Sequence, residues 1–174
     1  MRRAAWLAIG VLVFAACTDG SSDSSPKAEH ISIPHVSLPS NLSFDKAAWR
    51  KLWRETPGTS RHRCLDVGRR TNVRSGAFVA GNFVSFARGW DGTEANSKLY
   101  YIPLHPDPPA PLVVTATRLT PDPPLVLTLG FGKPNAWTLS GAPFYPTGTV
   151  LPERGRWRLE TVAGRNRGCF ELQL

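Results

Sequence analysis

Glycine and proline interrupt nearly every apolar run of this 174-residue chain. The sequence contains 16 Pro and 15 Gly, so few apolar segments are long enough for a core helix. Short runs rich in β-branched and aromatic residues, bounded by turn residues, are typical of strands. We therefore expect an all-β fold, a sandwich of seven or eight short strands. The candidate segments are residues 64–67, 77–86, 99–102, 112–119, 125–129, 147–151, 156–162 and 169–174.

One segment has helical instead of strand spacing. Within residues 44–55, Phe44, Ala48 and Leu52 recur every four residues, and so do Trp49 and Trp53. This spacing predicts one short amphipathic helix before the strands. Residue Ser43 is suited to cap its start, and the Pro-Gly pair at 57–58 to end it. At the other end of the chain, residues 157–174 predict a terminal β-hairpin with its turn at 164–168.

The N-terminus carries a targeting signal. Arg2 and Arg3 precede an apolar stretch, residues 4–16, that is too short to cross a bilayer, for which about 20 residues are needed. Residues 13–17, Val-Phe-Ala-Ala-Cys, resemble the lipobox of bacterial lipoproteins, which implies a lipid on Cys17. The alternative is an ordinary signal peptide with a chance cysteine. We expect a signal peptide at 1–16, a polar tether at 17–40 and a folded domain at 41–174, lipid-anchored to the cell membrane on its extracytoplasmic side.

The two remaining cysteines, Cys64 and Cys169, are predicted to form a disulfide. An exported protein meets an oxidising compartment, in which such a pair can close. In residues 169–174 the apolar positions alternate with Cys169, which puts its sulfur on the outer face or at a strand end. The alternative is a pair of separate buried thiols.

Two segments carry a second resemblance. Residues 98–119, and above all residues 151–159 with the sequence LPERGRWRL, resemble immunoglobulin-like β-sandwich domains of small bacterial envelope lipoproteins. The resemblance implies an immunoglobulin-like sandwich. It implies no catalytic residue, because many of these lipoproteins have no known function.

The sequence shows none of the common catalytic motifs. It has no Gly-x-Ser-x-Gly, no His-Glu-x-x-His and no phosphate-binding Walker loop. Residues 43–46 fit Ser-x-x-Lys, but a helix start explains them better. His62, Cys64 and His105 are candidate metal ligands, yet a cysteine held in a disulfide offers no thiolate. We expect no enzyme activity, no metal site and no cofactor.

Aromatic and basic residues supply the candidate ligand contacts. The rings are Trp90, Tyr100, Tyr101, Trp137, Phe144 and Tyr145, which can stack on sugars or anchor partners, or else fill the core. Arg156 and Arg158 lie on one face of a predicted strand and are candidate contacts for an anionic ligand. The alternative is that they simply form a solvated polar face. The formal net charge of +8 favours anionic partners. On the outer side of a membrane, the anionic partners to expect are lipids and wall polymers, and no nucleic acid is expected.

The sequence thus leads to two hypotheses. The first is a non-catalytic domain that binds or supports another component of the cell envelope, such as an envelope protein. The alternative is a carbohydrate or cell-wall polymer binding module.

Overall fold

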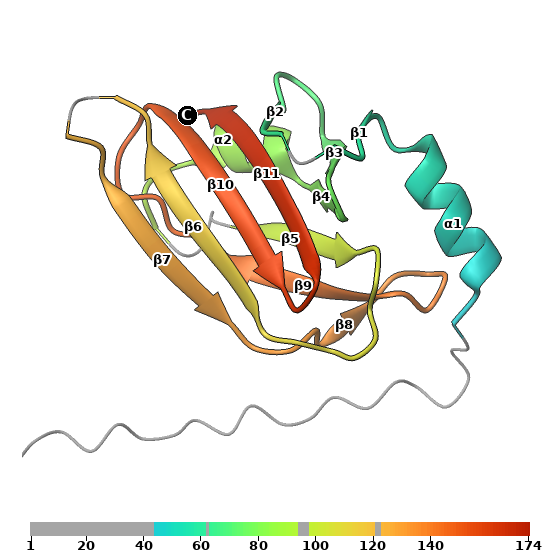
Figure 1. Cartoon of the computed structure of the whole chain (residues 1–174). Coiled ribbons are helices and arrows are strands. Elements are labelled where there is room, and N and C mark those ends of the chain that lie inside the picture. The colour runs from blue at the N-terminus through green and yellow to red at the C-terminus, as the bar shows by residue number, and fades with distance from the viewer. Residues whose placement is uncertain (1–43, 62, 94–97, 121–122) are drawn as a thin grey trace, which may run out of the picture. The chain divides into compact units, whose positions relative to one another are not determined.

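The computed structural model describes residues 44–174 except 62, 94–97 and 121–122. Cys17, Ser43 and the expected signal peptide and tether lie outside the described residues. Within the described ranges the chain is mostly β and forms a single compact unit (Figure 1). Its elements, in chain order, are α1 (Lys46–Glu55), β1 (Gly58–Thr59), β2 (Leu65–Asp66), β3 (Asn72–Ser75), β4 (Phe78–Gly81), α2 (Phe83–Gly89), β5 (Lys98–Pro103), β6 (Leu112–Arg118), β7 (Val126–Phe131), β8 (Ala136–Trp137), β9 (Pro143–Gly148), β10 (Arg156–Ala163) and β11 (Asn166–Gln173).

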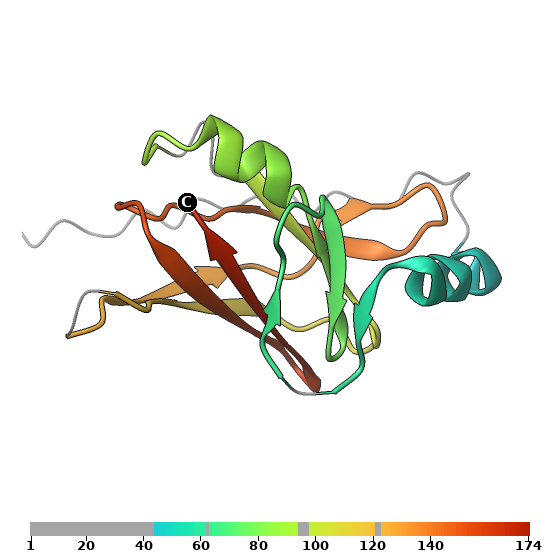
Figure 2. The ribbon, with the colours of Figure 1, turned by 90° about the horizontal axis from the view of Figure 1, so that it is seen from above.

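The strands form two sheets. One has six strands in the order β1-β3-β4-β5-β9-β8, and the other has five in the order β2-β11-β10-β6-β7. Neighbouring strands are antiparallel except for the pairs β1–β3 and β2–β11. Figure 2 shows the two sheets as separate layers, with α1 beside the six-stranded sheet on the side away from the five-stranded one. The expected sandwich-like arrangement of strands is therefore present.

Inward-facing side chains of both sheets form the main core. Residues alternate between the two faces of a strand, so Phe78 and Tyr101 of one sheet meet Trp157 and Phe170 of the other, and all four are fully buried. The indole N–H of Trp157 donates to the Glu153 carbonyl at 3.0 Å, which satisfies its one polar atom. Burying four large rings removes much apolar surface from water, which stabilises the packing of the two layers.

The predicted C-terminal hairpin is confirmed. β10 and β11 pair antiparallel from Arg156 opposite Gln173 to Ala163 opposite Asn166. The two-residue turn between them begins at Gly164, whose φ of 56° is a left-handed conformation that suits glycine.

The expected strand over residues 77–86 is wrong in its second half. β4 ends at Gly81, and residues 83–89 form α2. The change occurs at Asn82, which has a left-handed φ of 73° and donates from its side-chain amide to the Lys98 carbonyl at 2.6 Å. Asparagine tolerates this conformation better than most residues, so it ends the strand here. α2 then directs Phe83 and Phe86 into the core.

The structure also has more elements than the expected seven or eight strands and one helix. Eleven strands and two helices lie within the described residues. Three of the strands, β1, β2 and β8, contain two residues each, too few to give a periodic pattern in the sequence. The predicted helix is present as α1, but its N-cap is Asp45, whose carboxylate accepts from the N–H groups of Ala47 and Ala48.

The predicted disulfide between Cys64 and Cys169 is present, with the two Cα atoms 4.4 Å apart. Cys64 directly precedes β2, whose Leu65 lies opposite Phe170 of β11. The bond therefore joins two adjacent strands at one edge of the five-stranded sheet. It does not cross the core between the layers.

Candidate functional site

The outer face of the six-stranded sheet is unusually apolar for a surface. The alternation that buries Phe78 and Tyr101 points Val79, Tyr100 and Ile102 outward, together with Phe144 of β9. Val79 and Ile102 are nevertheless only 2% and 5% exposed, because α1 lies over them. Such a face needs a cover, since exposed apolar area is costly in water.

Two tryptophans fasten α1 to this face. Trp49 and Trp53 lie one helical turn apart, stack with ring centres 5.7 Å apart, and pack on Val79 and Ile102. The guanidinium carbon of Arg74 lies 5.6 Å from the centre of the Trp53 ring, within range of a cation–π contact. The N–H of Asp45 donates to the Ser140 carbonyl at 2.8 Å and fixes the start of the helix.

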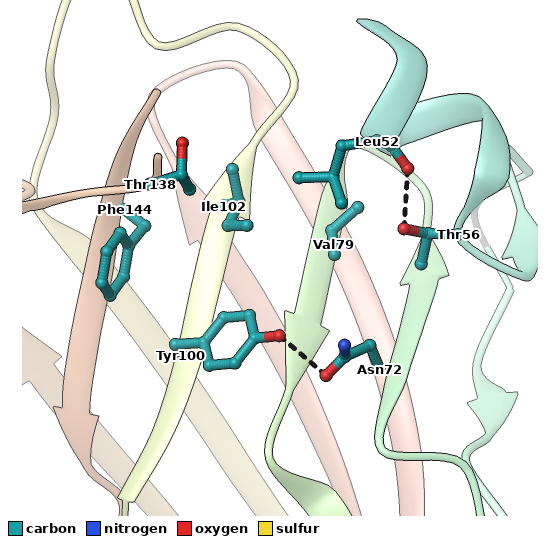
Figure 3. Close-up of a pocket in the computed structure, with 8 residues that line it drawn as sticks. All are labelled: Leu52, Thr56, Asn72, Val79, Tyr100, Ile102, Thr138 and Phe144. Carbon is teal, nitrogen blue, oxygen red and sulfur yellow. Dashed lines mark hydrogen bonds between the residues drawn. The ribbon is translucent and has the colours of Figure 1, made fainter. Parts of the chain in front are cut away.

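The helix covers only part of the apolar face, and a groove remains beside it. The groove has a volume of about 220 Å³, and Figure 3 shows side chains from α1 and the sheet around it. Most of these are apolar, and Leu52 of α1 forms one wall while keeping 37% of its surface exposed. The lining residues are Leu52, Thr56, Asn72, Val79, Tyr100, Ile102, Thr138 and Phe144.

A glycine shapes the floor of this groove. Asn72, Gly81 and Tyr100 lie side by side on β3, β4 and β5, and the Tyr100 ring extends across Gly81. Its hydroxyl donates to the Asn72 side-chain oxygen at 2.7 Å (Figure 3). A Cβ at Gly81 would overlap both Asn72 Oδ1 and Tyr100 Cζ, so only glycine leaves room for this contact. Tyr100 and Phe144 form an edge-to-face contact, with ring centres 6.0 Å apart.

The predicted aromatic contacts do not all gather at one place. Tyr100 and Phe144 line the groove, and burial raises the pKa of the Tyr100 hydroxyl. Tyr101 and Tyr145 are 0% and 3% exposed and belong to the core, where burial raises both pKa values, that of Tyr145 to about 12. Neither of these two rings is at the surface. Trp137 is half-buried in β8.

Trp90 already has two partners. Its indole N–H donates to the Leu151 carbonyl at 2.8 Å, and the Arg154 guanidinium lies 4.8 Å from the ring centre. One face of this half-buried ring is therefore covered by a cation of the same chain.

The predicted basic contacts lie on the other sheet and are paired. Arg156 and Arg158 point outward from β10 and bond to Glu171 of β11, at 2.7 Å and 2.9 Å. Arg156 also lies 3.8 Å from Asp66. Glu171 offsets much of the positive charge of the two arginines, which makes this face a mixed polar surface. A second hollow, of about 300 Å³, lies over the disulfide on the same face and is lined in part by Glu160 and Arg167.

Two searches of the described residues gave negative results. They contain no cluster of three or more His, Cys, Asp or Glu side chains placed to hold a metal ion. None of their helices combines the length and apolar character that crossing a bilayer requires.

Sequence reasoning pointed to two of the eight groove residues, Tyr100 and Phe144. Of the others, four lie on α1, β3, β4 and β5, and Thr56 and Thr138 directly follow α1 and β8. Only the folded chain brings them together. One signal was available: residues 44–55 carry two apolar stripes, Phe44-Ala48-Leu52 and Trp49-Trp53. A helix that docks on the sheet through one stripe has a second apolar stripe with which to contact another surface.

The chain was compared with known proteins in three ways. No protein-family model matches it, and neither the curated proteins nor the solved structures contain a match.

Proposed function

We propose that this chain is a lipid-anchored, non-catalytic domain on the extracytoplasmic side of a cell membrane, where it binds another protein of the envelope. The groove beside α1 is the observation that carries the proposal. Its 220 Å³ are less than the roughly 300 Å³ at which pockets for small molecules begin, so the groove suits one or two apolar side chains of a partner. Leu52, Tyr100 and Phe144 supply the apolar and aromatic contacts that dominate such interfaces.

The anchor and the family are part of the same proposal. The lipobox-like residues before Cys17 and the polar spacer after it support an exported, tethered domain. We propose that the sandwich is of the immunoglobulin-like kind found in small envelope lipoproteins. Trp157, the second residue of β10 and two positions after Gly155, supports this because it is fully buried between the sheets.

Site-specific photocrosslinking in cells tests the proposed function. Leu52 is replaced by a photoreactive phenylalanine analogue, and Val113 of β6 serves as the matched control. The two aliphatic side chains are 37% and 38% exposed, but only Leu52 lies in the groove. We expect one defined adduct with an exported protein from position 52 and none from position 113. Equal adducts from both positions, or none, would refute the groove as the binding site.

A carbohydrate or wall-polymer binding module is the alternative function. The favouring observation is Tyr100, whose ring lies in the groove beside the polar Asn72, an arrangement that can stack on a sugar and bond its hydroxyls. Co-sedimentation of the protein with purified wall polymers decides between the two. Binding that Leu52→Glu abolishes and Val113→Glu preserves would favour the polymer over the protein partner.

A further inference from the structure

The four edges of the two sheets are not alike. Within the described residues, the six-stranded sheet ends in β1 and β8, and the five-stranded sheet ends in β2 and β7. β1, β2 and β8 contain two residues each, whereas β7 contains six. Very short edge strands are a common means by which proteins avoid pairing with other chains. Three edges are protected in this way, and β7 is not (Figure 1).

β7 also lacks the other protective features. Its sequence, VLTLGF, contains no charged residue and no proline. Its pairing with β6 runs without interruption from Val126 opposite Thr117 to Phe131 opposite Leu112, so no bulge twists the edge away.

The backbone of β7 has hydrogen-bonding groups directed outward. The Arg118 N–H donates to the Leu125 carbonyl at 2.8 Å, and in an antiparallel ladder such bonded positions recur at every second residue. Residues 127, 129 and 131 therefore face β6, and the N–H and C=O groups of Val126, Thr128 and Gly130 face the open edge.

The side chains of β7 are incompletely covered as well. Leu127, Leu129 and Phe131 pack against the core but remain only partly buried. Val126, on the outer face, is 54% exposed. A further strand laid along this edge would cover these side chains and satisfy the outward backbone groups.

We propose that β7 pairs antiparallel with β7 of a second copy of this chain, so that two five-stranded sheets form one continuous sheet. A two-fold axis makes such an interface self-complementary. The chain carries a net charge of +8, so two copies repel each other on average, but the uncharged β7 lets them meet without opposed like charges. This inference depends on neither the lipid anchor nor the groove.

The alternation of side chains restricts the register. Residues opposite each other in a sheet point to the same face, so the leucines of one copy must lie opposite odd-numbered residues of the other. A symmetric pairing that keeps most of the strand in contact then centres on Thr128 or on Leu129, each opposite its own counterpart. Thr128 is close to the axis in both registers.

Thr128→Lys therefore tests the proposal, and Thr115→Lys is the matched control. Thr115 lies directly opposite Thr128 on β6, one strand further from the edge. In sedimentation velocity of the full chain at several concentrations, we expect a monomer–dimer equilibrium for the wild type. Thr128→Lys brings two like charges together and raises the dimer Kd by at least about tenfold. Thr115→Lys leaves the Kd within about twofold, and unchanged thermal unfolding shows that both variants are folded.

Crosslinking gives a second readout. Thr128→Cys treated with a short thiol crosslinker yields a covalent dimer, and Thr115→Cys does not, since facing Cβ atoms in a sheet lie about 5 Å apart. A wild type that stays monomeric would overturn the proposal, even if β7 paired with a different protein. So would a dimer that Thr128→Lys leaves intact.

Discussion

The outer faces of the two sheets differ, although their inner faces share one core. On the six-stranded sheet, Val79, Ile102 and Phe144 point outward, and the tryptophans of α1 cover part of this apolar surface. On the five-stranded sheet, Arg158 and Glu171 form an ion pair on the outer face, and neither helix of the described residues covers them. An apolar outer face needs a cover or a partner, whereas a polar one needs neither. The groove lies on the six-stranded sheet because its cover is incomplete.

The two sheets are stabilised by different contacts. Removing the disulfide, which joins two strands of the five-stranded sheet, should reduce the free energy of unfolding most. Cys64→Ser combined with Cys169→Ser frees a loop with a sequence separation of 105, which chain-entropy reasoning equates with roughly 4 to 5 kcal/mol of unfolding free energy. Urea unfolding of the double variant measures the loss. The reduced wild type should match it, and an unchanged unfolding midpoint would contradict the assignment.

The apolar face depends on its helix, and Trp53→Ala tests this. The substitution removes a ring that is 9% exposed and should cost about 3 kcal/mol, near the lower end for a buried tryptophan. Glu160→Ala on the polar face is the control and should change stability by less than about 0.5 kcal/mol. Urea unfolding of both variants compares the faces directly. Equal losses would mean that the two faces do not differ in the way described.

High pH should destabilise the six-stranded sheet in particular, because all three tyrosines with raised pKa values lie on β5 and β9. Tyr145 has a pKa of about 12 in the folded chain against 10.0 when unperturbed, so the folded state keeps a proton that the unfolded state releases. Its contribution is complete below pH 10 and falls by roughly 1.4 kcal/mol per pH unit between 10 and 12. Unfolding midpoints measured at rising pH should show the decline, and Tyr145→Phe should reduce its slope. A flat profile above pH 10 would show that the tyrosines are not shielded.

The polar face should contribute least. Glu171→Gln weakens the bonds to Arg156 and Arg158, which are both well exposed, and should cost about 1 kcal/mol or less. Added salt should shrink the difference from the wild type, because it screens exposed charges. Urea unfolding at low and high salt checks both points. A loss as large as that of Trp53→Ala would remove the distinction between the faces.

The parts of the fold that could be predicted have a local signal. The alternation in residues 156–174 predicted the hairpin, and the oxidising compartment implied by Cys17 predicted the disulfide. α1 was predicted from its stripes, but its cap was placed two residues early because Ser43 and Asp45 are both suitable caps. The two-residue strands are too short to show a periodic pattern in the sequence.

The groove could not be predicted, because it depends on register. Asn72, Gly81 and Tyr100 become neighbours only when β3, β4 and β5 pair as they do. The requirement for glycine at position 81 arises from a ring that is 19 residues further along the chain, which no local pattern contains. The pairing of Arg156 and Arg158 with Glu171 could not be predicted for the same reason, since Glu171 reaches them only through the hairpin pairing.

The position of the disulfide also determines how the domain would respond to pulling. Tension that enters from the N-terminal side loads α1 and β1 first, because both precede Cys64. Beyond Cys64 the load passes through the sulfur atoms to Cys169, near the C-terminal end, and bypasses the segment between them. A stretched molecule can therefore lose its helix, and with it one wall of the groove, while the segment between the two cysteines carries no load.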